Sequence, residues 1–180
     1  MRELPWGLRK ARLSFDALPE DTYEIVQSVE RSQSASSVRD LSRSCAVELS
    51  LPTGPRVHYG MLGATFVSED TGRLHVTIPL SSSDGEVVHE SLAGRIDTVH
   101  SGLPAEYLDG ILDVVDSETT AQLLGAGSLR FCCAAHGELG SSPWLFRGLS
   151  RIVIQLLSME HTPSTDEQLI EFIQEQLRYK

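Results

Sequence analysis

The stretch CAVELSLPTGPRVHYGMLGATFVSEDTGRLHVTIPL, residues 45–80, contains three segments that are expected to form strands. In its first part, large apolar residues alternate with smaller or polar ones as far as Pro52. This is the two-residue period of a half-buried strand. Residues 57–67 and 74–80 are two further segments of this kind, and residues 69–72, Glu-Asp-Thr-Gly, separate them. A glycine-containing turn between two such segments predicts an antiparallel hairpin.

Helical patterns follow these strands. After a short strand expected within residues 92–99, Pro104 opens a helix because proline is tolerated in a first turn. Residues 129–135 predict another strand, and Ser142 with Pro143 predicts the start of a second helix. The apolar residues of the first helix recur every three or four positions: Tyr107, Leu108, Ile111, Leu112 and Val115. We therefore predict an α+β protein, with a mostly antiparallel sheet and two helices packed on one face.

Additional segments are expected on both sides of this core. Residues 1–43 are interpreted as an N-terminal extension, with a helix over 18–29 and a polar linker over 31–43. Residues 44–160 form the predicted core. Residues 161–180 contain a C-terminal helix, because Ser164 and Glu167 have the spacing of a capping box.

The composition limits the possible partners and the cellular compartment of this protein. The net charge is -10, and residues 1–43 carry equal numbers of acidic and basic side chains, so the excess of acid lies in the core. An acidic domain is not expected to bind nucleic acid strongly on its own. Three cysteines cannot all pair, and no apolar run approaches the length of a membrane span. These features favour a cytoplasmic protein with reduced thiols and no membrane association.

Four short motifs resemble the fourth domain of translation elongation factor G. Residues 54–60, GPRVHYG, are similar to the Gly-Gly-Arg-Gly-Gln-Tyr-Gly loop with which that domain enters its central strand. Residues 101–108, SGLPAEYL, are similar to the segment that starts its first helix. The pairs Leu124-Gly125 and Ser141-Ser142, the latter followed by Phe146, resemble two further family segments in order and rough spacing.

This resemblance implies a fold and a candidate binding surface. In the family, the loop matched by residues 54–60 and the loop before the last core helix reach the ribosomal decoding region. Here the second loop, residues 137–140, is shorter and lacks the tip histidine of the family. No phosphate-binding Gly-x-x-x-x-Gly-Lys-Ser/Thr motif occurs, so a nucleotide-driven translocase is excluded for this chain alone. The candidate partner-binding residues are Gly54, Arg56, His58, Tyr59, Gly60 and His100.

The chemistry of Arg56 and Tyr59 allows two interpretations. An arginine and an aromatic ring can contact phosphate and stack on a base. Alternatively, Tyr59 packs in the sheet and Arg56 is a solvated charge, and the acidity of the domain favours this alternative. His100 precedes a predicted helix start and could contact an anion there, although an ordinary loop histidine is the simpler interpretation.

No catalytic or metal-binding residues are predicted. Residues 132–136, Cys-Cys-Ala-Ala-His, contain suitable ligand types, but side chains alternate along a strand. Cys132 and His136 would share one face at a spacing of roughly 13 Å, too far apart to share one ion. Buried structural thiols and no cofactor are therefore expected.

Three functions remain in competition. The sequence favours a non-enzymatic binding or scaffold protein that contacts an unknown protein partner or the ribosome. One alternative is a ribosome- or RNA-associated translation factor, and another is a small enzyme that assembles His58, His100 and Glu106 from distant positions. The terminal segments could also dock onto a second copy to form a homodimer.

Overall fold

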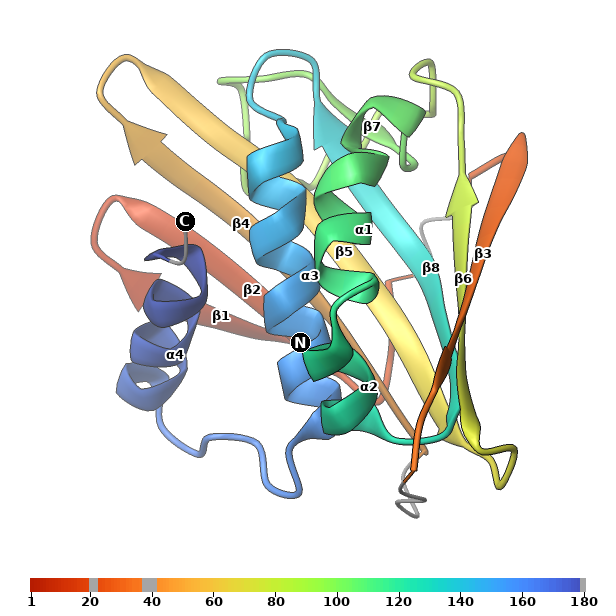
Figure 1. The fold of residues 1–180 in the computed structure, drawn as a ribbon. Coiled ribbons are helices and arrows are strands. Elements are labelled where there is room, and N and C mark those ends of the chain that lie inside the picture. The colour runs from red at the N-terminus through yellow and green to blue at the C-terminus, as the bar shows by residue number, and fades with distance from the viewer. Residues whose placement is uncertain (20–22, 37–41, 179–180) are drawn as a thin grey trace.

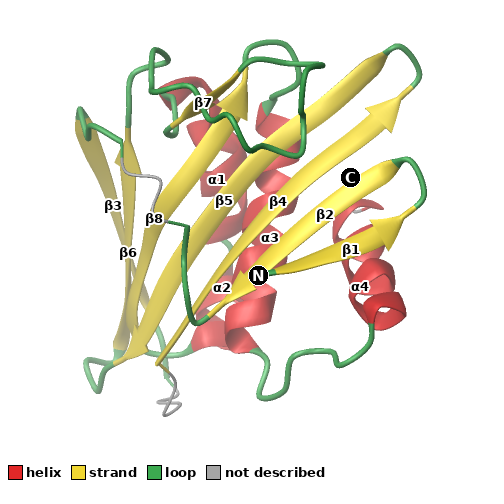
Figure 2. Ribbon diagram, turned by 180° about the vertical axis from the view of Figure 1, so that it is seen from behind, coloured by secondary structure: helices red, strands yellow, loops and turns green. Residues whose placement is uncertain are grey.

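A mixed sheet separates a layer of helices from a layer of loops (Figures 1 and 2). The computed structural model describes residues 1–19, 23–36 and 42–178. The strand order is β1-β2-β4-β5-β8-β6-β3, with short β7 beside β8. The strands are β1 (Arg2–Trp6), β2 (Arg9–Phe15), β3 (Gln27–Ser34), β4 (Ser42–Thr53), β5 (Arg56–Ser68), β6 (Arg73–Leu80), β7 (Val99–Ser101) and β8 (Gly127–Gly137).

The helices of the core cover one face of this sheet, as the sequence predicted. The helical segments are η1 (Ala105–Tyr107), α1 (Leu108–Val115), α2 (Glu118–Leu124), α3 (Pro143–Ser158) and α4 (Asp166–Arg178). Helix α3 packs on β4 and β5 and also contacts α1 and α2. The predicted C-terminal helix is α4, which lies near β1 at one edge of the sheet (Figure 1). The α+β class and the mostly antiparallel sheet are thereby confirmed.

The main core lies between the sheet and α3. Val47, Leu49 and Leu62 alternate with residues of the opposite face and are completely buried against the helices. Gly60 allows α3 to approach β5 closely, because a Cβ at this position would lie 2.9 Å from Leu149 Cδ1. Burial of each leucine side chain contributes about 1.5–3 kcal/mol. The apolar stripe of α3 therefore fixes the position of its first turn relative to the end of β5.

The predicted hairpin between residues 57–67 and 74–80 is wrong in its pairing. β8 lies between β5 and β6, antiparallel to β5 and parallel to β6. The turn at 69–72 reverses the chain, but its first residue donates a backbone hydrogen bond from Glu69 N to Ala126 O, just before β8. Residues 131–135 of β8 are continuously apolar, which is typical of a central strand covered on both faces. Local turn chemistry does not reveal that a later strand is inserted.

The connection from β6 to β8 has an uncommon hand. After β6 the chain first runs through residues 82–98, on the face of the sheet without helices, and through β7. It then passes through α1 and α2 in front of the sheet and returns along β8, on the side nearer β5 (Figures 1 and 2). This path is a left-handed crossover between parallel strands, whereas the right-handed form predominates strongly in proteins. β6 pairs with the first residues of β8, and β7 pairs with the last residues of β8.

The described residues of the segment 18–29 do not form the predicted helix. Of the segment 18–29, residues 20–22 lie outside the described part, and residues 27–29 begin β3, which pairs with β6. The preceding β1 and β2 form a hairpin on the opposite edge, where β2 pairs with β4. The predicted linker 31–43 contributes its first residues to β3 and its last two to β4, while 37–41 lie outside the described residues. Pairing of β3 with β6 therefore overrides a weak helical pattern at residues 27–29.

Helix capping follows the sequence closely. Ser142 caps α3 as predicted, because its Oγ accepts a hydrogen bond from Leu145 N at 3.3 Å. The capping box of α4 forms one residue later than predicted. Thr165 Oγ1 accepts from Gln168 N at 3.2 Å, and Gln168 Oε1 accepts from Thr165 N at 3.4 Å. Ser164 and Glu167 have the same spacing, so local pattern alone could not choose between the two pairs.

A β-bulge changes the predicted arrangement of the cysteines. The register between β5 and β8 shifts after Gly63, which pairs with Cys133, while the next residue on β5 pairs with Phe131. Cys132 is therefore an extra residue in its strand. The strict alternation that placed it on one face with His136 fails here. All three cysteines are free thiols, and burial raises the pKa of Cys45 to about 12.

The helices are short relative to the thickness of a bilayer. In the described part of the chain, none of them is long and apolar enough to cross a membrane.

The contact between α3 and β5 can be tested by removing a buried side chain. Leu149→Ala should lower the free energy of unfolding by about 2–5 kcal/mol, because it leaves a cavity over Gly60. Urea denaturation followed by circular dichroism measures this change. Leu139→Ala is the control, since that side chain is 86% exposed and its loss should change stability by less than about 0.5 kcal/mol. Equal effects of the two substitutions would contradict the packing described.

Candidate binding site at the hairpin end of the sheet

Several elements meet at one end of the sheet. The β1–β2 and β4–β5 hairpins turn there, α3 begins there, and α4 ends there (Figure 1). We call this region the hairpin end. It includes the loop of residues 54–60, from which most of the predicted site residues come.

Gly54 and Arg56 lie at the tip of the β4–β5 hairpin. Gly54 has a φ of +62°, a conformation that suits glycine, so its role there is to form the turn. Arg56 is exposed and pairs across the hairpin with Thr53. The arginine is therefore accessible to a partner, whereas the glycine shapes the tip.

His58 and Tyr59 point to opposite faces of the sheet. His58 is half-buried and packs edge-on against Trp144 at the start of α3, with 5.8 Å between the ring centroids. Tyr59 is 1% exposed and lies on the other face. Because its ring is covered, Tyr59 is not available for stacking on a base in this conformation. His58 and Tyr59 are neighbours in the sequence motif, but side chains alternate along a strand, so the two residues lie on opposite faces.

Tyr59 belongs to a network around a buried carboxylate. Its hydroxyl donates to Glu48 Oε1 at 2.9 Å, and Leu92 N donates to the same oxygen at 2.7 Å. Arg12 Nη1 donates to Glu48 Oε2 at 3.0 Å. A buried carboxylate is tolerated when it is paired and hydrogen-bonded in this way. The network thus holds residues 82–98, which we call the strap, against the sheet (Figure 2).

A second, small apolar cluster lies beneath the strap. Tyr59, Met61 and Ala135 from the sheet contact Leu92 and Ala93 of the strap. Gly60, next to Tyr59, faces the helices instead, and its missing side chain makes room for α3. Tyr59 and Gly60, two of the predicted binding residues, therefore have structural roles.

His100 lies away from the tip of the β4–β5 hairpin, on β7. Its Nδ1 is 2.8 Å from Gly85 O, and its Nε2 is 2.9 Å from Glu138 Oε1. These two acceptors favour the charged imidazolium, and the hydrogen bond with Glu138 is the main cause of the raised pKa of His100. His100 therefore joins the strap to the β8–α3 loop.

His136 stacks on His100 and is buried. The ring centroids are 5.9 Å apart. His136 Nδ1 lies 3.2 Å from Gly102 O, and Nε2 lies 3.3 Å from Ser83 O. Burial lowers the pKa of His136 in spite of these two carbonyl groups. A neutral imidazole has one N–H, so it can donate to only one of these carbonyls at a time.

The main feature of the hairpin end is a pocket that contains both tryptophans of the chain, which no local sequence pattern indicated. Its volume is about 260 Å³. We call it the tryptophan pocket, and its lining residues are Trp6, Arg9, Leu51, Thr53, Trp144, Gln174, Leu177 and Arg178. They come from β1, β2, β4, α3 and α4, which are distant in sequence. Trp144 is 45% exposed, so it is not a core residue.

The electrostatics of this pocket differ from those of the whole chain. Arg9 and Arg178 are its charged lining residues, and no acidic residue lines it. The guanidinium carbon of Arg9 lies 5.2 Å from the ring centroid of Trp6, a cation–π geometry. His58 contacts Trp144, and Arg56 lies across the hairpin from Thr53. A positively charged, aromatic surface therefore exists on a protein of net charge -10.

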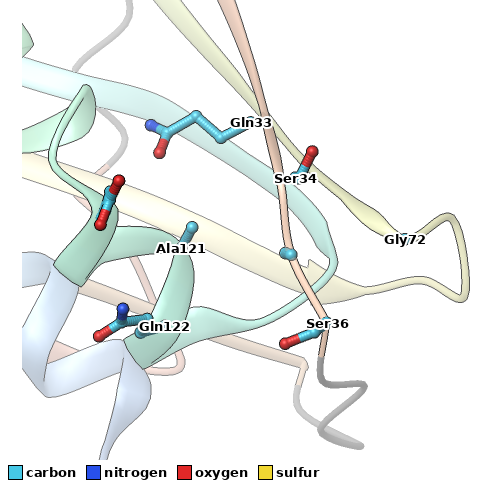
Figure 3. Close-up of a pocket in the computed structure, with 8 residues that line it drawn as sticks. Gln33, Ser34, Ser36, Gly72, Ala121 and Gln122 are labelled. Carbon is cyan, nitrogen blue, oxygen red and sulfur yellow. The ribbon is translucent and has the colours of Figure 1, made fainter.

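A larger cavity lies at the other end of the sheet. Its volume is about 530 Å³, and Gln33 on β3 and Gln122 on α2 lie on opposite sides of it (Figure 3). The remaining lining residues are Ser34, Ala35, Ser36, Gly72, Glu118 and Ala121. This lining offers one ionisable side chain and no aromatic ring, so it has fewer groups that could recognise a specific ligand.

Histidine, cysteine and carboxylate side chains are the usual ligands of a metal centre. Within residues 1–19, 23–36 and 42–178, no three or more His, Cys, Asp or Glu side chains are grouped so that they could hold a metal ion.

Comparison with known proteins gave no relative. No protein-family model, no curated protein and no solved structure matches this chain.

The structural role of Tyr59 can be tested by removing one oxygen atom. Tyr59→Phe should lower the free energy of unfolding by about 1–2 kcal/mol, because Glu48 loses one of its buried donors. Urea denaturation measures the change. If Tyr59 served solely as a stacking ring for a ligand, loss of its hydroxyl group would leave the stability unchanged.

The bond between His100 and Glu138 should depend on pH. Because folding raises the pKa of His100, its contribution to stability is complete below its ordinary pKa of about 6.5 and is lost as the pH rises through the folded value. Glu138→Gln should therefore lower the pKa of His100, measured by NMR titration. It should also reduce the free energy of unfolding more at about pH 5.5 than at about pH 8.

Glu171→Gln is the matched control for this measurement, because Glu171 is an exposed carboxylate on α4. It should leave the titration of His100 unchanged. An equal loss of stability at both pH values for Glu138→Gln would show that the charge on His100 does not contribute.

Proposed function

We propose that this protein is a non-enzymatic binding module and that the tryptophan pocket is its contact surface for a protein partner. The observation that carries this proposal is the convergence of both tryptophans and two arginines on one cavity. Tryptophan and arginine are enriched among the residues that dominate binding energy at protein interfaces. Half of the Trp144 side chain is already buried, so a partner would complete its burial at a low entropic cost.

The charges around the pocket support the same proposal. Arg9, Arg56 and Arg178 form no ion pair with any residue that the structure describes. Four other arginines do pair with carboxylates: Arg2, Arg12, Arg31 and Arg147. In a chain with 25 acidic and 15 basic residues, internal partners are plentiful. Other described arginines, such as Arg73 and Arg95, also form no ion pair, so the distinguishing feature of Arg9 and Arg178 is their position beside two tryptophans. This position favours an external partner.

The enzymatic alternative receives less support. It required His58, His100 and Glu106 to act together, but His58 packs on Trp144 while His100 contacts Gly85 and Glu138. The buried carboxylate of Glu48 is held by three donors from the sheet and the strap. These groups serve to hold the fold together, which supports a binding role for the protein as a whole.

We also propose that the core is related to the fourth domain of elongation factor G and that the protein acts in the cytoplasm. The order of strands and helices in residues 42–158 supports this relationship. So does the position of the two loops that the resemblance singles out. The β4–β5 hairpin and the β8–α3 loop are adjacent, since Tyr59 N donates to Gly140 O at 3.1 Å and Ser141 Oγ donates to Tyr59 O at 2.6 Å.

A ribosomal or RNA partner is the second candidate, because the resembling loops face the ribosome in that family. Arg56 is the exposed residue that favours it. The net charge of -10 opposes it, because an RNA strand presents many phosphates to the whole surface. We therefore place a protein partner first.

Affinity capture from native lysate, followed by mass spectrometry, tests the proposal. The tagged protein should enrich a defined protein, and Trp144→Ala should abolish that enrichment while the protein stays folded by circular dichroism. Val67→Ala is the control, because Val67 is 46% exposed, close to the value for Trp144, and lies at the other end of β5. It should retain the partner.

Three other results of this capture would contradict the proposal. Trp144→Ala and the wild type could capture the same proteins. Ribosomal proteins could be enriched, and this enrichment could be lost in Arg56→Ala but kept in Trp144→Ala. That result would support the translation role. Capture of a second copy of the chain would indicate a homodimer, which size-exclusion chromatography would confirm.

A further inference from the structure

We infer that the tryptophan pocket receives a peptide segment in which an aromatic side chain stands next to a carboxylate. This inference rests on the proposed function, because it identifies the chemistry of the partner at the same pocket. Three properties of the pocket lead to it: its size, the rings that line it, and the charges at its rim.

The size of the pocket limits what it can hold. Sites for whole small molecules usually measure about 300–1,000 Å³. At about 260 Å³, this pocket falls below that range and suits one large side chain. A nucleotide with its sugar and phosphate would extend well beyond it.

The lining favours an aromatic side chain as the occupant. Trp6 and Trp144 provide ring surfaces, and Leu51 and Leu177 provide aliphatic surface. Aromatic rings pack favourably against one another in offset or edge-to-face geometries, and His58 already packs on Trp144 in the edge-to-face form. An aromatic anchor in a pocket of this kind is the usual centre of a peptide-binding hot spot.

The rim favours a carboxylate beside that anchor. Arg9 is held near Trp6 by its cation–π contact, so less side-chain entropy is lost when its guanidinium group binds an anion. Arg178 is the second cation of the lining, and neither arginine is neutralised by a described residue. A planar guanidinium group matches the geometry of a carboxylate and can bind it through two hydrogen bonds.

A phosphate-rich ligand fits the whole molecule less well than a peptide. One or two carboxylates would interact mainly with the arginines at the rim. An RNA strand would also bring further phosphates near an acidic surface, and each would be repelled. The observations therefore favour an acidic peptide with an aromatic residue over single-stranded RNA.

The two tryptophans provide a direct assay. Their indole N–H groups give two separate signals in an NMR spectrum that correlates ¹H with ¹⁵N, and both residues line the pocket. The probe is the capped peptide acetyl-Ser-Asp-Phe-Glu-Ser-amide, added to the full-length protein at about 0.15 M salt. We expect both indole signals to shift in a saturable manner.

Matched probes and variants separate the contributions of the ring and the charge. Replacing Phe by Ala in the peptide, or Asp and Glu by Asn and Gln, should each weaken binding about tenfold or more. Arg9→Gln and Arg178→Gln should each weaken binding of the acidic peptide by a similar factor and leave the uncharged peptide unaffected. Arg95→Gln, at an exposed arginine of the strap, is the control and should bind the peptide normally.

The outcomes distinguish this inference from the proposed function. Equal binding of the acidic and uncharged peptides would overturn the role of the carboxylate. Tighter binding of a ten-nucleotide oligouridylate, weakened by Arg9→Gln, would replace the peptide by RNA. If no peptide shifts the indole signals up to millimolar concentration, the inferred ligand class is wrong. The proposed function would still hold in that case if capture of a partner from lysate depends on Trp144.

Discussion

The close approach of α3 to β5 at Gly60 fixes the position of this helix on one face of the sheet. Because Gly60 has no side chain, Leu145 and Leu149 pack directly over the strand. This contact fixes the first turn of α3 at the hairpin end, and with it the side chain of Trp144. The half-exposed tryptophan is thus held by a buried interface of α3 and by His58, and needs little reorganisation to bind a partner.

The other face of the sheet depends on a different interaction. Glu48 lies on this face with both carboxylate oxygens occupied by donors from Arg12, Tyr59 and Leu92. Its charge is compensated inside the fold, in contrast to the arginines of the hairpin end. The same residue types therefore have two roles here. On the strap side, the paired charges of Glu48 and Arg12 stabilise the structure, whereas Arg9 and Arg178 at the tryptophan pocket are available to an external ligand.

Local patterns predicted much of the core but none of its long-range pairing. The strand that ends near Pro52 and the helix that begins after Ser142 follow from alternation and capping, which involve near neighbours in sequence. The insertion of β8 between β5 and β6 depends on a strand more than forty residues further along the chain, so no turn motif could indicate it. β3 was missed because its edge position tolerates a polar sequence that resembles a linker.

The candidate site shows the same limit. Gly60 and Tyr59 were chosen as binding residues because they match a family motif, but the structure gives each of them a packing role. The tryptophan pocket could not be predicted, because five elements contribute to it and its residues span positions 6 to 178. The one available signal was that both tryptophans lie near helix or hairpin ends with arginines close by.

The origin of the pocket residues bears on how such a site could arise. Thr53 and Trp144 belong to the core, whereas Trp6 and Arg9 come from the N-terminal hairpin and Leu177 and Arg178 from α4. The matched motifs span residues 54 to 146, so the two added elements lie outside the region of resemblance. If the core is related to a translation factor, these additions enclose the flank of the retained hairpin and convert an exposed loop into the wall of a pocket. Recognition at this end would then centre on one side chain and its neighbouring charge, because the added elements bring Trp6, Arg9 and Arg178 beside Trp144.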